Sequence, residues 1–359
     1  MIPFYINAFL IILVDVIIFA VTKDIDKRRK YVCILNTLQI LLFVSLRGES
    51  VGNDTQNYVN YFRSVVNNPQ SALTRNVYEI GFRWYTYFIA KITSDPRIFL
   101  TIGACISIIP LGIIIYKYSK DCVLSFYAFS TMEFILFAMT GMRQNVAYFF
   151  VYSSYILFQS DRKILKIFAL VLVIGGGFFH RSAWAFLIIY LMELIKNQAA
   201  KKLVYIVGVF SAYIFRYQIG QILVDRFFNA YQVGSTGAYS RMLIAALVLL
   251  FSITYYNTII KQSTIDACET NSVSLFPSLV DAMFLTTFFF IIALAVSASA
   301  RQGRYFFVFF TLLLPELQYA IVEDQRRLFK GVIFLLLTAL MLYLFPHNGL
   351  CTYGYSFWR

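Results

Sequence analysis

"IPFYINAFLIILVDVIIFAV", residues 2–21, is an apolar run in which Asp15 is the only charged residue. A helix of about 20 residues spans the hydrocarbon core of a bilayer. The run has no basic segment before it and no small-residue cleavage pattern after it. We therefore interpret it as a retained transmembrane helix and not as a signal peptide.

Similar apolar runs recur along the whole chain, and 60% of its 359 residues are hydrophobic while 14% are charged. A soluble domain carries about 25% charged residues. The pattern predicts an all-α, polytopic integral membrane protein with about 11–13 transmembrane helices. The further candidate spans lie at roughly 31–46, 98–116, 122–139, 144–159, 164–180, 183–195, 203–219, 241–260, 281–299, 304–320 and 331–346.

The rest of the composition narrows the possible classes of protein. No hydrophilic stretch is long enough to form a separate soluble domain, so we treat residues 1–359 as a single transmembrane domain. The cysteines are scattered and form no CxxC pair, which indicates neither a metal site nor a disulfide framework. We expect no cofactor, no metal and no nucleic-acid partner.

Lysines and arginines occupy different connectors between the candidate spans. The lysine-rich connectors alternate with the others, so the positive-inside rule places them in the cytoplasm and both termini outside. The opposite side carries 13 of the 18 arginines but, among 13 lysines, only Lys91. The lysine-rich connectors are "KDIDKRRK" (23–30), "KYSK" (117–120), "DRKILK" (161–166), "KNQAAKK" (196–202), Lys261 and "QRRLFK" (325–330).

The arginine excess needs its own explanation, because both residue types serve the positive-inside rule alike. Arginine offers a planar, permanently charged fork that binds phosphate or carboxylate at two points. We infer a site for an anionic ligand in the outer half. Alternatively, some arginines extend to lipid headgroups, as we expect for Arg216, Arg226 and Arg359. The outer arginines are Arg47, Arg63, Arg75, Arg83, Arg97, Arg143, Arg181, Arg216, Arg226, Arg241, Arg301, Arg304 and Arg359.

The longest outer segment, about 47–97, is the expected active-site segment at the outer face. It opens with "SLRGESVGNDTQNYVNYF" (45–62), whose glycines Gly48 and Gly52 permit a tight, non-helical backbone. Such backbone at membrane depth lines protein or a watery cavity, so we expect a cavity rim with sugar-binding tyrosines and asparagines. An ordinary solvated loop is the alternative. "VYEIGFRWYTYFIAKI" (77–92) predicts an amphipathic helix at the outer membrane surface.

Three further stretches place polar residues on the same side. "TGMRQNVAYFF" (140–150) puts Arg143 and Gln144 at the start of an apolar helix, where an anion is favoured. "GGGFFHRSAW" (175–184) places His180 beside Arg181, and the histidine could be a general base, a phosphate donor or a helix cap. "SASARQGRYFF" (297–307) offers the pair Arg301 and Arg304 before Tyr305, which suits a diphosphate or, alternatively, lipid headgroups.

The order of these motifs resembles the EpsG-like, Wzy-type polysaccharide polymerase family of bacterial envelopes. The resemblance spans about residues 47–305, and the large late periplasmic loop of many O-antigen polymerases is missing, which favours the EpsG-like branch. The motifs are R-x4-G-x-D-x3-Y (Arg47, Gly52, Asp54, Tyr58), E-x-G-F (Glu79, Gly81, Phe82), "MRQ" (Met142 to Gln144), "FHRSA" (Phe179 to Ala183) and R-x2-R-Y (Arg301, Arg304, Tyr305).

The resemblance implies a metal-independent membrane glycosyltransferase in the bacterial cytoplasmic (inner) membrane. Its active site would face outward and move a glycan from undecaprenyl diphosphate onto a sugar hydroxyl of another lipid-linked repeat unit, for an O-antigen, a capsule or an exopolysaccharide. Its partners would be these lipid-linked oligosaccharides, membrane lipid, a chain-length regulator and a flippase. The alternatives are a glycan ligase or acyltransferase, and a flippase for lipid-linked oligosaccharides.

Residue roles follow from the chemistry of that transfer. Breaking the bond to the diphosphate develops negative charge, which arginines fixed in a water-poor cavity stabilise. The candidate bases for the attacking hydroxyl are Glu79, Asp54 and His180, and either carboxylate could instead orient an arginine. The expected substrate-binding residues are Arg47, Tyr58, Arg143, Gln144, Arg181, Arg301, Arg304 and Tyr305.

Overall fold

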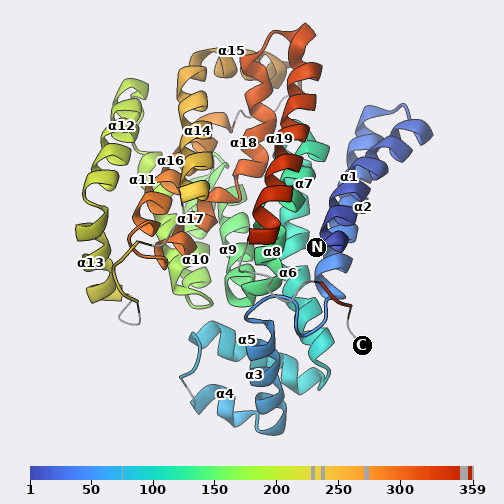
Figure 1. Ribbon diagram of the computed structural model, residues 1–359, viewed down its shortest axis with the longest axis vertical. Coiled ribbons are helices and arrows are strands. Elements are labelled where there is room, and N and C mark those ends of the chain that lie inside the picture. Colours follow the sequence, from blue (N-terminus) through green and yellow to red (C-terminus); the bar gives the residue numbers. More distant parts are fainter. Residues whose placement is uncertain (75, 228–230, 236–238, 271–274, 348–354, 358–359) are drawn as a thin grey trace. The chain divides into compact units, whose positions relative to one another are not determined.

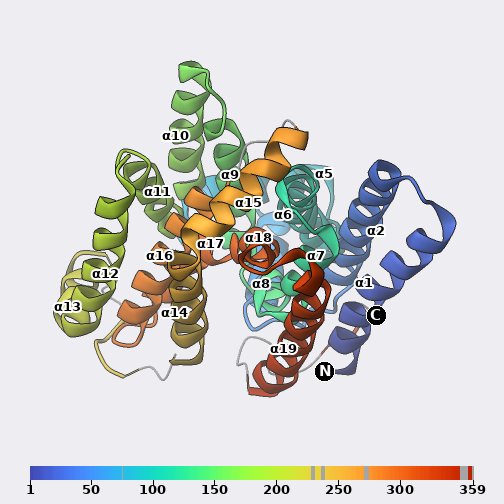
Figure 2. The same ribbon diagram turned by 90° about the horizontal axis from the view of Figure 1, so that it is seen from above.

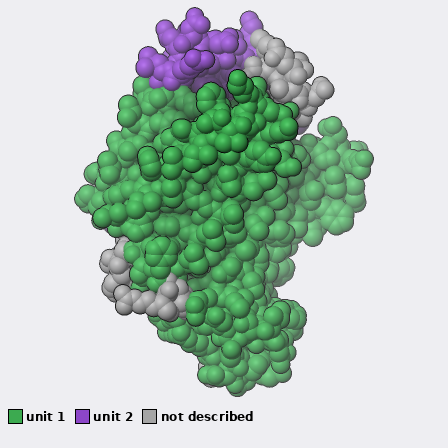
Figure 3. All heavy atoms as spheres, turned by 90° about the vertical axis from the view of Figure 1, so that its right-hand side faces the viewer, with its two compact units in different colours: residues 1–184, 330–359 green, residues 185–329 purple. Residues whose placement is uncertain are grey.

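The computed structural model describes residues 1–359 except 75, 228–230, 236–238, 271–274, 348–354 and 358–359, so Arg75 and Arg359 lie outside the described residues. Within the described ranges the chain consists of helices and turns, without a β-strand (Figure 1). The chain forms two compact units, residues 1–184 with 330–359, and residues 185–329 (Figure 3). That it folds as a single domain stays a prediction.

Aspartates mark where several helices of the first unit begin. Asp24 accepts hydrogen bonds from the backbone N–H groups of the first turn of α2, and Asp95 and Asp121 do the same for α6 and α7. The helices of this unit are α1 (Ile2–Val21), α2 (Ile25–Ser45), α3 (Thr55–Asn67), α4 (Gln70–Thr74), α5 (Ile80–Ile92), α6 (Pro96–Tyr118), α7 (Cys122–Thr131), α8 (Phe134–Thr140), α9 (Met142–Phe158), α10 (Lys163–Gly177) and most of α19 (Arg326–His347).

The second unit is organised around one buried helix, α16 (Phe276–Ala293), which packs against α12, α14 and α17 (Figure 2). Its buried Asp281 binds Lys201 Nζ and Tyr205 OH of α12, each at 2.5 Å. The other helices are α11 (Leu187–Met192), α12 (Gln198–Ile214), α13 (Arg216–Phe227), α14 (Tyr239–Thr254), α15 (Tyr256–Thr270), α17 (Ser299–Phe307) and α18 (Phe310–Glu316), with short 3-10 helices at Leu317–Ala320 and Glu323–Gln325.

Several helices are long and apolar enough to cross a membrane, which confirms an all-α, multi-pass membrane protein. Among the described residues, four segments qualify alone: Ile2–Val21, Pro96–Tyr118, Phe276–Ala293 and Glu323–His347. The count rises to seven if three bent helix pairs each form one span; α7 and α8 bend by 60°, α12 and α13 by 79°, and α14 and α15 by 70°.

Fewer described helices meet these limits of length and composition than the about 11–13 transmembrane helices expected from the sequence, and the exact count stays a prediction. Helices α9 and α10 have 17 and 15 residues, so at about 1.5 Å per residue they fall short of a bilayer core of about 30 Å. Helix α2 is long enough but carries a charged first part, "DKRRK". The run at 183–195 forms only a short 3-10 helix, Arg181–Phe186, followed by the six residues of α11.

Helices α3, α4 and α5 form a small helical layer at one end of the first unit (Figure 1). The core that they share with α6 contains Tyr58, Phe62, Phe82 and Phe99, and the rings of Phe62 and Phe99 stack with centroids 4.5 Å apart. The helix predicted at 77–92 is confirmed as α5. Its position on a membrane surface stays a prediction.

Candidate active site

A cavity of about 580 Å³ opens in the first unit, between the start of α5, the start of α9 and the end of α10. It contains three of the site residues predicted from the sequence, which are Glu79, Arg143 and Arg181. The full lining is Asn76, Val77, Tyr78, Glu79, Ile80, Arg83, Arg143, Gly177, Phe178, Arg181 and Trp184.

Gly81 joins two walls of this cavity. Its backbone N–H donates a hydrogen bond to the carbonyl oxygen of Phe178, at 2.8 Å. A Cβ on residue 81 would lie 2.8 Å from that oxygen and 2.9 Å from the ring of Phe179, so a side chain would separate the two segments. The E-x-G-F motif and the stretch "GGGFFHRSAW" (175–184) are therefore in contact, and Gly81 allows the first turn of α5 to approach the end of α10.

Gly52 shapes the turn that precedes α3. Its φ of +84° lies in the left-handed region, and a Cβ there would lie 2.5 Å from the carbonyl oxygen of Met139. The hydroxyl of Thr55 donates to that same oxygen at 2.8 Å and to the Val51 carbonyl at 2.6 Å. The expected non-helical backbone therefore covers the start of the segment, while α3 begins at Thr55 and carries Tyr58 toward the cavity.

Arg143 is held from three sides. Its Nη1 donates to Oε2 of Glu79 at 2.5 Å, and its Nε lies 3.5 Å from the hydroxyl of Tyr58. Its guanidinium lies over the ring of Tyr78, 4.6 Å from the centroid, in a cation–π contact. The side chains of Arg143 and Glu79 are only 22% and 14% exposed. The first turn of α9 thus holds Arg143 in an orientation that is fixed before any ligand binds.

The two tyrosines beside Arg143 remain protonated at neutral pH. Burial raises the pKa of the Tyr58 hydroxyl, and the charge of Arg143 opposes that rise. Burial raises the pKa of Tyr78 to about 12. Tyr58 is only 4% exposed and its ring packs against Tyr78 and Phe82, so it reaches the site through its hydroxyl and not as an open stacking surface.

The cavity carries a net positive charge. Arg83 donates to the carbonyl oxygen of Leu73 at 3.2 Å and to Oδ1 of Asn76 at 2.7 Å. Arg181 is exposed, and no hydrogen bond or ion pair holds it within the part of the chain that the structure describes. Three lining arginines face one lining carboxylate, Glu79, which leaves an excess of two positive charges. Such a cavity suits a ligand with at least two negative charges.

Other predicted residues of the first unit lie around the cavity without lining it. Asp54 is exposed at the start of α3, and its charge contributes to the raised pKa values of Tyr58 and Tyr78 after the larger effect of burial. His180 is 8% exposed, and its Nδ1 lies 2.5 Å from the hydroxyl oxygen of Ser182. Gln144, next to Arg143, is buried at 2% exposure.

Arg47 is buried in a structural position. It is 2% exposed, and its Nη1 donates to the carbonyl oxygen of Val44 at 2.5 Å, in the last turn of α2. A cation at a helix C-terminus satisfies a free carbonyl and stabilises the helix dipole. Its expected part in ligand binding therefore stays a prediction, without support from the lining of the cavity.

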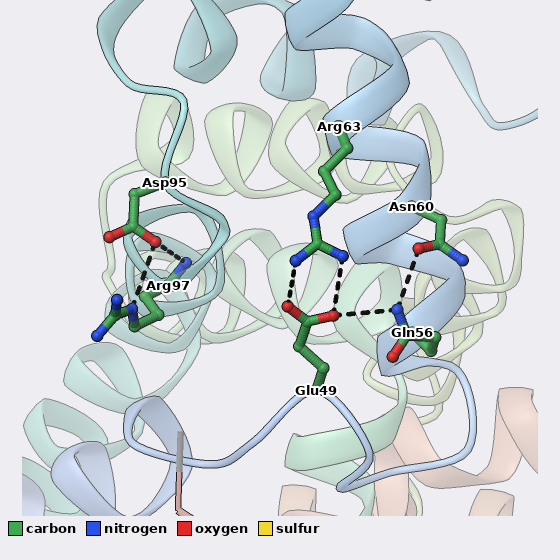
Figure 4. A network of polar contacts seen from close by, with 6 residues as sticks. All are labelled: Glu49, Gln56, Asn60, Arg63, Asp95 and Arg97. Atoms are coloured by element: carbon green, nitrogen blue, oxygen red, sulfur yellow. Dashed lines mark hydrogen bonds and ion pairs between the residues drawn. The ribbon is translucent and has the colours of Figure 1, made fainter. Parts of the chain in front are cut away.

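Two arginines that the sequence predicts on the outer side form ion pairs with nearby carboxylates (Figure 4). Arg63 binds Glu49 with both terminal nitrogens, and Gln56 donates to the same carboxylate at 3.0 Å. Arg97 contacts Asp95, with Nε and Oδ1 3.6 Å apart, at the start of α6. Local ion pairing thus accounts for part of the arginine excess.

Arg301, Arg304 and Tyr305 lie together on α17 of the second unit and are described with that unit alone. Arg301 lies over the ring of Tyr231, 5.4 Å from the centroid. Arg304 and Tyr305 are 9% and 0% exposed. Their role in ligand binding stays a prediction.

Eight of the eleven lining residues were not among the sequence-based site residues: Asn76, Val77, Tyr78, Ile80, Arg83, Gly177, Phe178 and Trp184. Three of them had a weak signal in the chain. Tyr78 adjoins Glu79, Arg83 follows it by one helical turn, and Trp184 follows Arg181 by three positions. Among the described residues, no group of three His, Cys, Asp or Glu could hold a metal ion, and a metal-independent reaction stays a prediction.

Comparison with known proteins finds a matching family model. The model of the EpsG family matches residues 30–357, which include every residue described in the cavity. No curated protein and no solved structure matches the chain. The match covers nearly the whole sequence, and the chain therefore belongs to the EpsG family.

Proposed function

We propose that this protein is a polysaccharide polymerase of the bacterial cytoplasmic membrane, acting on undecaprenyl-diphosphate-linked repeat units at the outer face. Membership of the EpsG family supports a polymerase-like role. The observation that carries the proposal is the cavity in which Arg143, fixed by Glu79, lies with two further arginines. The separation of lysines from arginines supports an outward-facing site.

Arg143, Arg83 and Arg181 bind the diphosphate of the donor lipid in this proposal. As the bond between the anomeric carbon and the diphosphate oxygen breaks, negative charge grows on the phosphate oxygens. Donors that are already oriented stabilise this charge without further reorganisation, which is often the largest contribution to catalysis. Glu79 is then a positioning residue, because its carboxylate holds the guanidinium of Arg143 in place.

The acceptor hydroxyl of a second repeat unit attacks the anomeric carbon, and the lipid diphosphate leaves. The hydroxyl proton needs a base. Glu79 is occupied by Arg143, and His180 is only 8% exposed, with its Nδ1 2.5 Å from the hydroxyl oxygen of Ser182. We therefore assign the base to Asp54, which does not line the cavity but is exposed at the start of α3 and acts electrostatically on Tyr58 and Tyr78. Asp54 is exposed, and no side-chain hydrogen bond caps α3 from it, which leaves its carboxylate available.

Polymerisation uses two lipid diphosphates, one on the donor and one on the acceptor. The first unit offers one arginine cavity, and α17 of the second unit carries Arg301 and Arg304 one turn apart. We assign this second pair to the other diphosphate. The guanidinium groups of Arg301 and Arg304, at positions i and i+3, match a ligand with adjacent phosphates.

The test uses the host strain lacking the gene, complemented with wild type, Arg143→Ala, Arg301→Ala or the control Arg63→Ala. Arg63 is also an outer arginine, but it pairs with Glu49 outside the cavity. Surface glycan is separated on a gel, and membrane levels of each variant are measured. We expect single repeat units in the deletion strain and a ladder with wild type and Arg63→Ala. Arg143→Ala and Arg301→Ala should be present in the membrane without restoring the ladder.

Other results would replace the proposal. Full-length but unattached or unmodified polymer in the deletion strain would identify a ligase or an acyltransferase. Repeat units that accumulate facing the cytoplasm would identify a flippase. A full ladder with Arg143→Ala at normal protein level would refute the assignment of the diphosphate to this cavity.

A further inference from the structure

Trp184 stands at the cavity in a fixed orientation and is nevertheless open to solvent. It lines the cavity and is 44% exposed. Its indole N–H donates to the carbonyl oxygen of Ile174 at 3.1 Å, in the last turn of α10. Phe178 meets the indole edge-on, with ring centroids 6.4 Å apart at 85°. The indole of Trp184 is thus held in one orientation at the wall of the cavity.

Gly177 makes room for this indole. A Cβ built on Gly177 would overlap the indole nitrogen and the neighbouring ring carbons of Trp184. Gly175, on the same helix, differs, because a Cβ there would lie 3.4 Å from the ring of Phe150, which is ordinary contact. The last glycine of "GGG" is therefore required by the position of the Trp184 ring.

Arg181 and Trp184 lie on the same side of one short helix. They occupy positions i and i+3 of the 3-10 helix Arg181–Phe186, and residues with this spacing eclipse each other in a 3-10 helix. Both line the cavity. A diphosphate bound by Arg181 and Arg143 would therefore place the group bonded to it close to the indole face.

We propose that Trp184 is the platform of a sugar-binding subsite, on which the first sugar ring attached to the diphosphate stacks. This inference rests on the proposed function. A pyranose has an apolar C–H face, which suits a large and rigid aromatic surface, and a polar rim. Asn76 can serve that rim, since Arg83 binds its Oδ1 at 2.7 Å and leaves the amide N–H groups available as donors.

The isoprenoid chain is the other group bonded to the diphosphate, and the cavity offers it a different wall. Val77 and Ile80 line the cavity from the start of α5 and are 58% and 48% exposed. This wall is aliphatic, whereas the polar residues Asn76 and Arg83 favour a sugar. We therefore assign the sugar to Trp184 and the chain to Val77 and Ile80.

The test measures equilibrium binding to the full-length protein in lipid nanodiscs. Two probes are used, the lipid-linked repeat unit extracted from the deletion strain and undecaprenyl diphosphate without sugar. The variants are Trp184→Ala, Trp184→Phe, Gly177→Ala and Arg143→Ala, with Gly175→Ala as the matched control. Binding of the sugar-free lipid also reports whether the Trp184 and glycine variants are folded, and thermal unfolding reports this for Arg143→Ala.

Trp184→Ala and Gly177→Ala should each weaken binding of the repeat-unit lipid by about tenfold, as expected when an aromatic platform under a stacked ring is lost. Binding of undecaprenyl diphosphate should change by less than about twofold, and Gly175→Ala should bind both probes normally. Trp184→Phe keeps an aromatic face, so it should lose less affinity for the repeat-unit lipid than Trp184→Ala.

Two results would overturn the inference. If Trp184→Ala weakens the binding of both probes equally, Trp184 contacts the isoprenoid chain or is needed for folding. If Trp184→Ala weakens the binding of neither probe, Trp184 is not part of the site. The proposed function is judged separately by Arg143→Ala. Weaker binding of both probes in that variant keeps the diphosphate assignment whatever Trp184 does, and unchanged binding of both refutes it.

Discussion

Replacing Glu79 by glutamine in two backgrounds, wild type and Arg143→Ala, separates its possible roles. If Glu79 only positions Arg143, its loss matters only while Arg143 is present. If Glu79 is the general base, its loss slows the reaction by the same factor in both backgrounds. The structure predicts the first case, because Nη1 of Arg143 and Oε2 of Glu79 are 2.5 Å apart and both side chains are mostly buried.

The size of the effect follows from the kind of contact. A hydrogen bond between charged groups contributes about 1.5–3 kcal/mol, so Glu79→Gln alone should slow the reaction about 10- to 100-fold. Loss of Arg143 removes a charged donor at the leaving group and should slow it about 100- to 1,000-fold. The double variant should be no slower than Arg143→Ala.

The assay is the initial rate of polymer formation from extracted lipid-linked repeat units, with the protein in nanodiscs at matched concentration. Arg63→Ala serves as a control, because its guanidinium pairs with Glu49 and does not line the cavity. A further loss of about 100- to 10,000-fold on adding Glu79→Gln to Arg143→Ala would refute the positioning role and make Glu79 the base.

Three other variants test separate parts of the structure. Asp54→Asn should slow polymerisation about 100-fold or more at normal protein level, because this exposed carboxylate is assigned as the base. Gly52→Ala should lower the melting temperature and membrane level, since a left-handed backbone with a side chain costs about 1–2 kcal/mol and Met139 blocks the Cβ. Lys201→Ala should destabilise the protein by about 3–5 kcal/mol, seen in thermal unfolding, because Asp281 would remain buried without its cation.

Each of these three has a result that contradicts it. Asp54→Asn with normal rates would return the base to Glu79 or His180. Gly52→Ala with unchanged melting would mean that the turn relaxes, and Gly331→Ala is its control, since a Cβ there meets nothing within 4 Å. Lys201→Ala with unchanged melting would mean that Asp281 takes up a proton or another partner at no measurable cost.

The helices and the class of protein could be read from the chain because they depend on local properties. A helix forms its backbone hydrogen bonds within one segment, so apolar runs are enough to indicate where many of the helices lie. The order of short motifs was enough to indicate the family. Apolar composition did not reveal the bends of 60–79° or the short lengths of α9 and α10, so fewer described helices have the length of a full span than the sequence predicts.

The candidate site was decided by tertiary structure. Glu79 and Arg143 are 64 residues apart in the chain, and they meet because Gly81 lets α5 approach the end of α10. The sequence alone determined that most arginines and most lysines fall in different connectors. Some of these arginines line a common cavity, one, Arg47, caps a helix, and others pair with a carboxylate. The tertiary structure decides between these outcomes, because electrostatic interactions depend on the distance between charges in space and not on their separation along the chain.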